Sequence, residues 1–194
     1  MREIDRKSYG TAARELIEKA EAAALPKTLN VGTPVAEALP LLRAMTDQTL
    51  SQNRRVRMPH DAEALHAGLW ALFDYFTESH DLAQKIATPS GSYWHAILHR
   101  REPDFSNAKY WFDRVGEHPV GPELLDDARE ITAAAGPAGK PLHEQLLSQT
   151  AWNGAWFVDR CAAAGDPATT AVLLNLQRRE WALLFDYNFR KAFA

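Results

Sequence analysis

Residues 61–87 read DAEALHAGLWALFDYFTESHDLAQKIA, and they carry the clearest helical pattern in the sequence. Apolar side chains recur there at steps of three and four residues, at Leu65, Leu69, Leu72, Phe73 and Phe76. Because an α-helix completes a turn every ~3.6 residues, this spacing gathers them on one face. Such a face is buried against other helices, so the stretch predicts one long helix at the centre of a helical core.

Similar patterns continue on both sides of this stretch, and strand-like alternation of apolar and polar residues lasts nowhere for more than a few positions. Proline, glycine and capping residues divide the chain, as at Thr33 before Pro34 and at Gly116. The predicted helices cover about residues 9–25, 33–46, 61–87, 90–101, 106–115, 122–135, 142–150, 152–164 and 167–193. The sequence therefore predicts an all-α fold, a bundle of about eight or nine helices.

The size and composition of the chain favour a single domain. Its 194 residues fit around one core, so we expect one all-helical domain over residues 1–194. Hydrophobic residues make up 46% and charged residues 24%, which is the balance of an ordinary globular protein. The net charge of −3 and the pI of about 6.2 lack the basic character of nucleic-acid-binding proteins, so no nucleic-acid partner is expected.

Cysteine usage and hydropathy indicate the compartment. Cys161 is the only cysteine, so no internal disulfide forms and nothing points to an oxidising compartment. The first residues are charged, and no apolar run approaches the ~20 residues of a membrane span. A cytoplasmic protein without membrane insertion is therefore expected.

Polar reactive residues and aromatic residues are densest in residues 88–119. If residues 90–101 are helical, His95 and His99 lie one turn apart on the same face as Ser92, with Glu102 near its end. Two imidazoles at this spacing can share a divalent metal ion, and a carboxylate can complete the shell. His80 and His118 are further candidates if the fold brings them to the same end of the bundle.

Two common metal motifs are missing from the sequence. Ala96 follows His95 where a zinc protease helix carries glutamate, so hydrolysis of that kind is not indicated. A ferritin-like di-iron site uses two Glu-x-x-His pairs, and the sequence offers only Glu63 with His66. A mononuclear site remains open.

The same face also fits chemistry without a metal. His95 or His99 could act as a general base oriented by Glu102, because an imidazole titrates near physiological pH. Arg100 and Arg101 would then bind a small anionic ligand, since a guanidinium matches carboxylate or phosphate oxygens. The alternative for all these residues is a polar surface in which the arginines pair with nearby carboxylates.

Two function classes remain open from the sequence. The leading interpretation is a small-molecule-binding protein or enzyme with a site centred on His95 and His99. The alternative is a non-catalytic helical interaction or scaffold domain, such as a homodimer joined through an exposed aromatic face. The six tryptophans allow the second interpretation, because aromatic residues are enriched at interfaces.

Residues 91–119 also resemble a segment shared by a family of uncharacterised microbial proteins. The resemblance is carried by Ser92-Tyr93-Trp94-His95, by His99-Arg100-Arg101-Glu102 and by Asn107-Ala108-Lys109-Tyr110-Trp111-Phe112. The C-terminal segment from Glu180 to Tyr187 is similar to the ending of the same family. Together these segments cover about a quarter of the chain. No activity is assigned to the family, so the resemblance implies a kind of protein and not a function.

Overall fold

The stretch 61–87 forms two helices and not the single one that was predicted. A computed structural model describes residues 4–193, and in it three residues separate α4 (Pro59–Leu72) from α5 (Phe76–Ala83). Asp74 lies between them with φ of 64°, in the left-handed region that ends a right-handed helix. Aspartate tolerates this conformation better than most residues. The chain therefore turns at Asp74, and α5 leaves α4 in a new direction.

The fold is all-α, as predicted, with more helices than expected. The structure has eleven α-helices and three short 3₁₀ helices over residues 4–193, and no strand in that range. The remaining α-helices are α1 (Thr11–Ala22), α2 (Leu39–Ala44), α3 (Asp47–Ser51), α6 (Pro89–Arg101), α7 (Phe105–Val115), α8 (Gly121–Ala134), α9 (Lys140–Leu147), α10 (Gly154–Ala162) and α11 (Pro167–Phe193). The 3₁₀ helices are η1 (Arg6–Ser8), η2 (Ala36–Ala38) and η3 (Gly136–Ala138).

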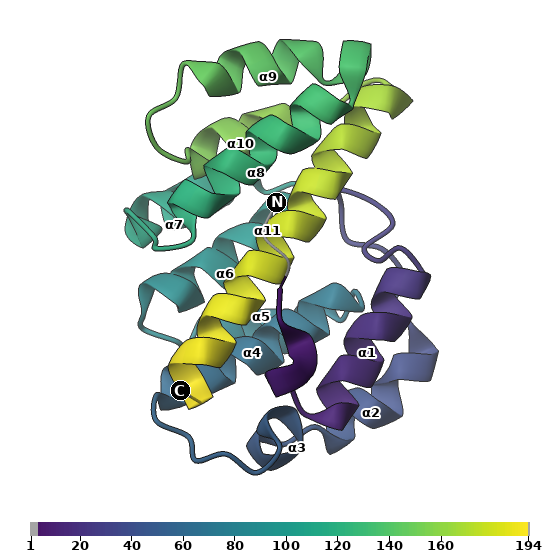
Figure 1. Cartoon of the computed structure of the whole chain (residues 1–194), viewed down its shortest axis with the longest axis vertical. Coiled ribbons are helices and arrows are strands. Elements are labelled where there is room, and N and C mark those ends of the chain that lie inside the picture. The colour runs from purple at the N-terminus through teal and green to yellow at the C-terminus, as the bar shows by residue number, and fades with distance from the viewer. Residues whose placement is uncertain (1–3, 194) are drawn as a thin grey trace.

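The long helix α11 connects the two ends of the molecule (Figure 1). Its C-terminal half packs with α1, α4 and α6 around the larger apolar core. Its N-terminal half packs with α8, α9 and α10 around a smaller one. Helices α6 and α7 lie against each other near the junction, and α7 also contacts α10. The two cores thus share one helix and belong to one domain.

A buried ion pair fastens α6 to α11. The Arg100 guanidinium donates to both carboxylate oxygens of Glu180, at 2.5 and 3.2 Å, and both side chains are fully buried. Tyr93 donates to the same carboxylate at 3.3 Å, and the ring of Phe157 lies 4.3 Å from the guanidinium carbon. Buried charges are tolerated when they are paired and hydrogen-bonded, so this cluster fixes how α6 sits on α11.

The surface offers little support for an aromatic dimer interface. The large hydrophobic side chains exposed among the described residues are Met58, Tyr110 and Leu147, and no tryptophan is among them. The homodimer therefore stays a prediction. In residues 4–193, no helix has both the length and the apolar character needed to span a bilayer.

Candidate functional site

Helix α6 supplies the two histidines that the sequence predicted as neighbours. Thr88 caps the helix by accepting a hydrogen bond from the Gly91 amide at 3.2 Å, and Pro89 occupies the first turn, where its missing N–H costs nothing. The regular helix that follows stacks the rings of His95 and His99 one turn apart, with ring centres separated by 4.6 Å. Both side chains are buried, with about 5% of each residue exposed.

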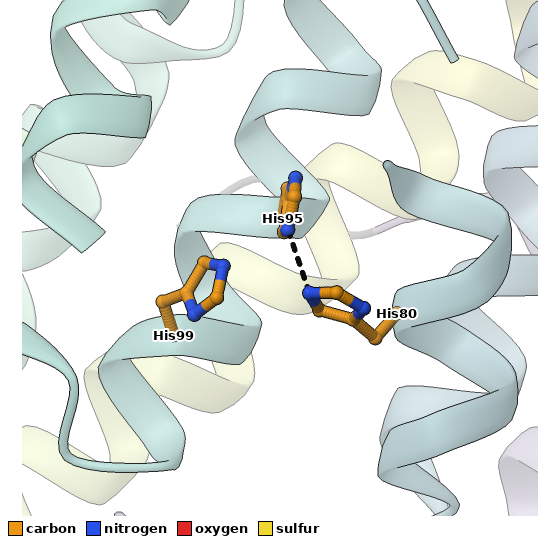
Figure 2. A group of neighbouring side chains, drawn as sticks. All are labelled: His80, His95 and His99. Atoms are coloured by element: carbon orange, nitrogen blue, oxygen red, sulfur yellow. Dashed lines mark hydrogen bonds between the residues drawn. The ribbon is translucent and has the colours of Figure 1, made fainter. Parts of the chain in front are cut away.

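His80 joins this pair from α5, so the structure brings together three histidines. Its Nε2 lies 2.8 Å from Nε2 of His95, and its ring centre lies 5.3 Å from that of His99. Figure 2 shows the three rings turned toward one another across the space between the two helices. One potential ligand nitrogen from each residue lies within 4.8 Å of the other two. We call His80, His95 and His99 the histidine cluster.

Aromatic side chains hold two of the rings in place. The Trp111 indole of α7 packs against His95 with ring centres 4.1 Å apart, and Phe76 stacks on His80 at 5.5 Å. Flat contacts of this kind restrict ring rotation and keep water from those faces. The cluster is therefore preorganised by α5 and α7 as well as by α6.

The third ring, His99, is held by polar partners. Its Nδ1–H donates to Oε1 of Glu102 at 2.6 Å, and the Asn107 side-chain amide donates to its Nε2 at 3.1 Å. These two contacts select the tautomer that carries its proton on Nδ1 and leaves a lone pair on Nε2. In this tautomer the Nε2 lone pair of His99 accepts from Asn107, while its Nδ1–H faces a carboxylate.

Two of the three rings, His80 and His95, resist protonation. Burial, followed by the nearby His99 and His80, lowers the pKa of His95 to about 3. Burial chiefly, and then His99, lowers the pKa of His80. A neutral imidazole keeps a free lone pair, so at neutral pH these rings are ready to bind a cation other than the proton. The Nδ1 atom of His95 is buried and has no hydrogen-bond partner.

Arg100 and Arg101 lie beside the histidines in sequence but face other partners. Arg100 pairs with Glu180 in the core. Arg101 donates to Asp74 at 2.5 Å and to the carbonyl oxygens of Ala71 and Asn30. The anionic ligand therefore stays a prediction, and in the structure both guanidinium groups are buried and paired with internal carboxylates.

His118 lies apart from the histidine cluster. Its Nδ1 accepts a hydrogen bond from the Val120 amide at 3.3 Å, and its Nε2–H donates to the Ser90 hydroxyl at 3.2 Å. Its ring packs edge-on against Tyr93 and Tyr187. The structure therefore does not bring His118 to the site for which it was a candidate together with His80, because its partners Ser90 and Tyr93 lie on a different face of α6 from His95.

Sequence reasoning missed two residues that shape the cluster. Asn107 and Trp111 were not among the predicted site residues, although each contacts a cluster histidine. Their spacing of four residues places both on one face of α7, and this spacing was the sequence signal that could have identified them.

No family model, curated protein or solved structure matches this chain, so membership of the resembled microbial family stays a prediction.

Proposed function

We propose that the histidine cluster binds a divalent transition-metal ion and that the protein is a metal-dependent small-molecule-binding protein or enzyme. The observation that carries the proposal is the convergence of three imidazoles, from α5 and α6, with one potential ligand nitrogen of each within 4.8 Å of the other two. Imidazole is the donor that zinc, copper, nickel and ferrous iron share. Three protein ligands leave a coordination position for water or a small molecule, as in catalytic zinc sites.

The ligand nitrogens of the cluster lie within 4.8 Å of one another and would have to shift to hold such an ion. A tetrahedral ion with metal–nitrogen bonds of about 2.0–2.1 Å holds two ligand nitrogens about 3.3 Å apart. The Nε2 atoms of His80 and His95 are 2.8 Å apart, so these rings need to separate by about 0.5 Å. The ion would also take over the Nε2 lone pair of His99, to which the Asn107 amide now donates.

The surroundings of His99 support a ligand role. Metal-bound histidines usually donate their second ring N–H to a carboxylate, which orients the ring and strengthens the metal bond. Glu102 accepts that hydrogen bond from His99. It also brings a negative charge close to a cluster made only of neutral ligands, which favours a bound cation.

Metal-free general-base catalysis by His95 is a weaker interpretation than a metal-ligand role. A general base works best when its pKa lies near the operating pH. The pKa of His95 is lowered to about 3, so at neutral pH this ring has little tendency to accept a proton. A low pKa does not handicap a metal ligand, because the ligand must be deprotonated in any case.

The test is elemental analysis of protein purified without chelator or immobilised metal. We expect close to one ion per chain in the wild type, and its loss from a His95→Ala, His99→Ala double variant. His60→Ala is the matched control, because His60 lies on α4 with its side chain 58% exposed and outside the cluster. Circular dichroism establishes that each variant is folded.

Two results would contradict the proposal. One is a folded wild type that takes up no zinc, cobalt or nickel ion when these are offered in excess. The other is equal metal content in the wild type and the folded double variant, which would place the ion elsewhere. Metal loss from the double variant alone, with the His60→Ala variant unchanged, is the outcome that the convergence of the three rings leads us to expect.

A further inference from the structure

A cavity between α1 and α11 lies outside the histidine cluster. It has a volume of about 320 Å³ and is lined by α1, the segment that follows α1, the end of α4 and the middle of α11. Pockets for small molecules span about 300–1,000 Å³, so the space suits a small ligand. None of His80, His95 and His99 lines the cavity, which therefore does not belong to the metal site proposed above.

Most of the cavity wall is apolar. The side chains that form this part of the wall are Ile17, Ala20, Leu25, Leu72, Trp181 and Ala182. Ile17, Leu72 and Trp181 also belong to the buried core. The indole N–H of Trp181 already donates to the carbonyl oxygen of Gly68 at 2.8 Å. These side chains therefore offer no hydrogen bond to a ligand and favour an alkyl group.

Three charged residues complete the lining of the cavity, and two of them neutralise each other. The Arg6 guanidinium of η1 donates to one carboxylate oxygen of Glu21 and pairs with the other, both at 2.5 Å. The third charged residue is Arg178 of α11, so the charged groups of the lining sum to one positive charge. A cavity whose lining carries an excess positive charge attracts an anion.

Arg178 has no carboxylate partner among residues 4–193. Its Nε and Nη2 atoms donate to the carbonyl oxygen of Pro26 at 3.2 and 2.9 Å, and Nη2 also donates to that of Ala24. Its Nη1 donates to the side-chain oxygen of Asn175 at 3.2 Å. These acceptors are neutral and leave the positive charge uncompensated, and burial lowers the pKa of Arg178. Because a guanidinium has five N–H donors, one on Nη1 remains for a ligand.

A wider groove of about 800 Å³ between α11 and α8 adjoins the cavity. Four residues line both spaces: Arg6, Glu21, Arg178 and Ala182. Arg178 therefore lies where the cavity and the groove meet. Asn175 lines the groove beside it, and Glu130 and Arg179 add one charge of each sign. A negatively charged head group at this junction can contact Arg178 while its apolar part fills the cavity.

We propose that this cavity binds a small amphipathic monocarboxylate, with its alkyl chain against Ile17, Leu72 and Trp181 and its carboxylate against Arg178. The apolar wall accounts for the alkyl chain, and the single uncompensated guanidinium accounts for the single negative charge. A dianion would bring its second charge close to Glu21 without a second uncompensated cation in the cavity lining. The carboxylate binds independently of any metal at the histidine cluster.

The test compares octanoate with 1-octanol, two eight-carbon molecules of which only octanoate is charged. The readout is the indole ¹H–¹⁵N signal of Trp181, identified among the six tryptophans by its absence from a Trp181→Phe variant. Octanoate is expected to shift this signal in a saturable way, with a Kd in about the millimolar range. It should bind about tenfold more tightly than 1-octanol, as one charge-assisted hydrogen bond implies. Hexanoate lacks two methylene groups and should bind about tenfold more weakly than octanoate.

Two variants of Arg178 test the role of the charge. Arg178→Gln removes the charge and should weaken octanoate binding about tenfold, with the affinity for 1-octanol unchanged. Arg178→Lys keeps the charge and should recover most of the affinity for octanoate. Circular dichroism establishes that both variants are folded.

Two further variants separate the cavity from other binding places. Ala182→Phe puts a ring at a half-buried position that lines the cavity, and it is expected to abolish the octanoate shift. Ala171→Phe is the matched control, an exposed position of the same helix outside the cavity and the groove, and it should leave the shift unchanged. The folded His95→Ala, His99→Ala variant should also bind octanoate normally, which distinguishes this site from the metal site.

Three results would overturn the assignment. One is the absence of a saturable shift at the Trp181 indole with octanoate. A second is equal affinity for octanoate and 1-octanol, because the charge of Arg178 would then play no part. The third is an unchanged octanoate response in a folded Ala182→Phe variant, which would place the molecule elsewhere.

Discussion

The buried pair of Arg101 and Asp74 is the feature that most directly sets the position of His80. Arg101 ends α6, and Asp74 forms the turn from which α5 departs. Removing the charge of Asp74 would leave the Arg101 guanidinium buried without its counterion, because the two side chains are only 4% and 6% exposed. Breaking a buried pair in this way costs about 3–5 kcal/mol.

The contacts that Arg101 keeps narrow the expected loss of unfolding free energy. In an Asp74→Asn variant, Arg101 keeps its hydrogen bonds to the carbonyl oxygens of Ala71, at 2.8 Å, and Asn30, at 3.2 Å. We therefore expect the low end of the range, about 3 kcal/mol. Asp74→Ala should lose about 1 kcal/mol more, because alanine tolerates the left-handed backbone at this position less well than asparagine.

Urea unfolding followed by circular dichroism measures both variants. With an m-value of about 3 kcal/mol/M, the midpoint should fall by about 1 M for Asp74→Asn and further for Asp74→Ala. The matched control is Asp81→Asn, an exposed position on α5, which should change the unfolding free energy by less than about 0.5 kcal/mol. An Asp74→Asn variant within about 0.5 kcal/mol of the wild type would refute the reasoning, because the pair would then contribute nothing that its neighbours do not supply.

Three further changes test other parts of the structure. Glu102→Gln removes the carboxylate that orients His99 and should weaken metal binding about 10- to 100-fold, measured by competition with a chelating dye, with little change in stability. Burial lowers the pKa of His118 from 6.5 to about 4, so the unfolded state binds the proton first as the pH falls. The stability that His118 contributes is then fully present above pH 6.5 and is lost toward pH 4, by up to about 3 kcal/mol. Urea titrations of His118→Gln should therefore show an acid-induced decrease smaller by about this amount, with the part due to His80 and His95 still present. Gly154→Ala places a methyl group 2.3 Å from the Phe112 ring and should lower the unfolding free energy by about 1–3 kcal/mol in the same assay, whereas an unchanged midpoint would mean that α10 and α7 separate easily.

Much of the fold could be predicted because its signals are local. Helix α11 runs over Pro167–Phe193, as expected from the break at Gly165 and Asp166, and α6 and α7 lie within one residue of their predicted bounds. Capping residues and prolines act on the turn in which they stand, so the sequence displays them directly.

The break at Asp74 could not be predicted in this way. The apolar spacing from Leu65 to Phe76 continues through it, and the reason for the turn lies in Arg101, 27 residues further along. The burial of Arg100 depends in the same way on Glu180, which is 80 residues away. Pairings over such separations follow from tertiary packing, which a periodic pattern does not encode.

The candidate site shows the same contrast between local and long-range contacts. His95, His99 and Glu102 are neighbours within one helix end, and the sequence placed them together. His80 joins them only because α5 turns back toward α6, and His118 stays away because it packs beside Tyr93 on the other face. Local spacing therefore predicts the pair of His95 and His99, and the tertiary fold adds His80.

The most direct test of the metal site is X-ray absorption at the edge of the bound ion, zinc or cobalt, in the wild type and in His80→Ala. Three imidazole ligands at about 2.0–2.1 Å are expected in the wild type, and two after the substitution of His80, with water in the freed position. A wild-type spectrum with fewer than three imidazoles, or a spectrum that the loss of His80 leaves unchanged, would contradict a metal centre built from His80, His95 and His99.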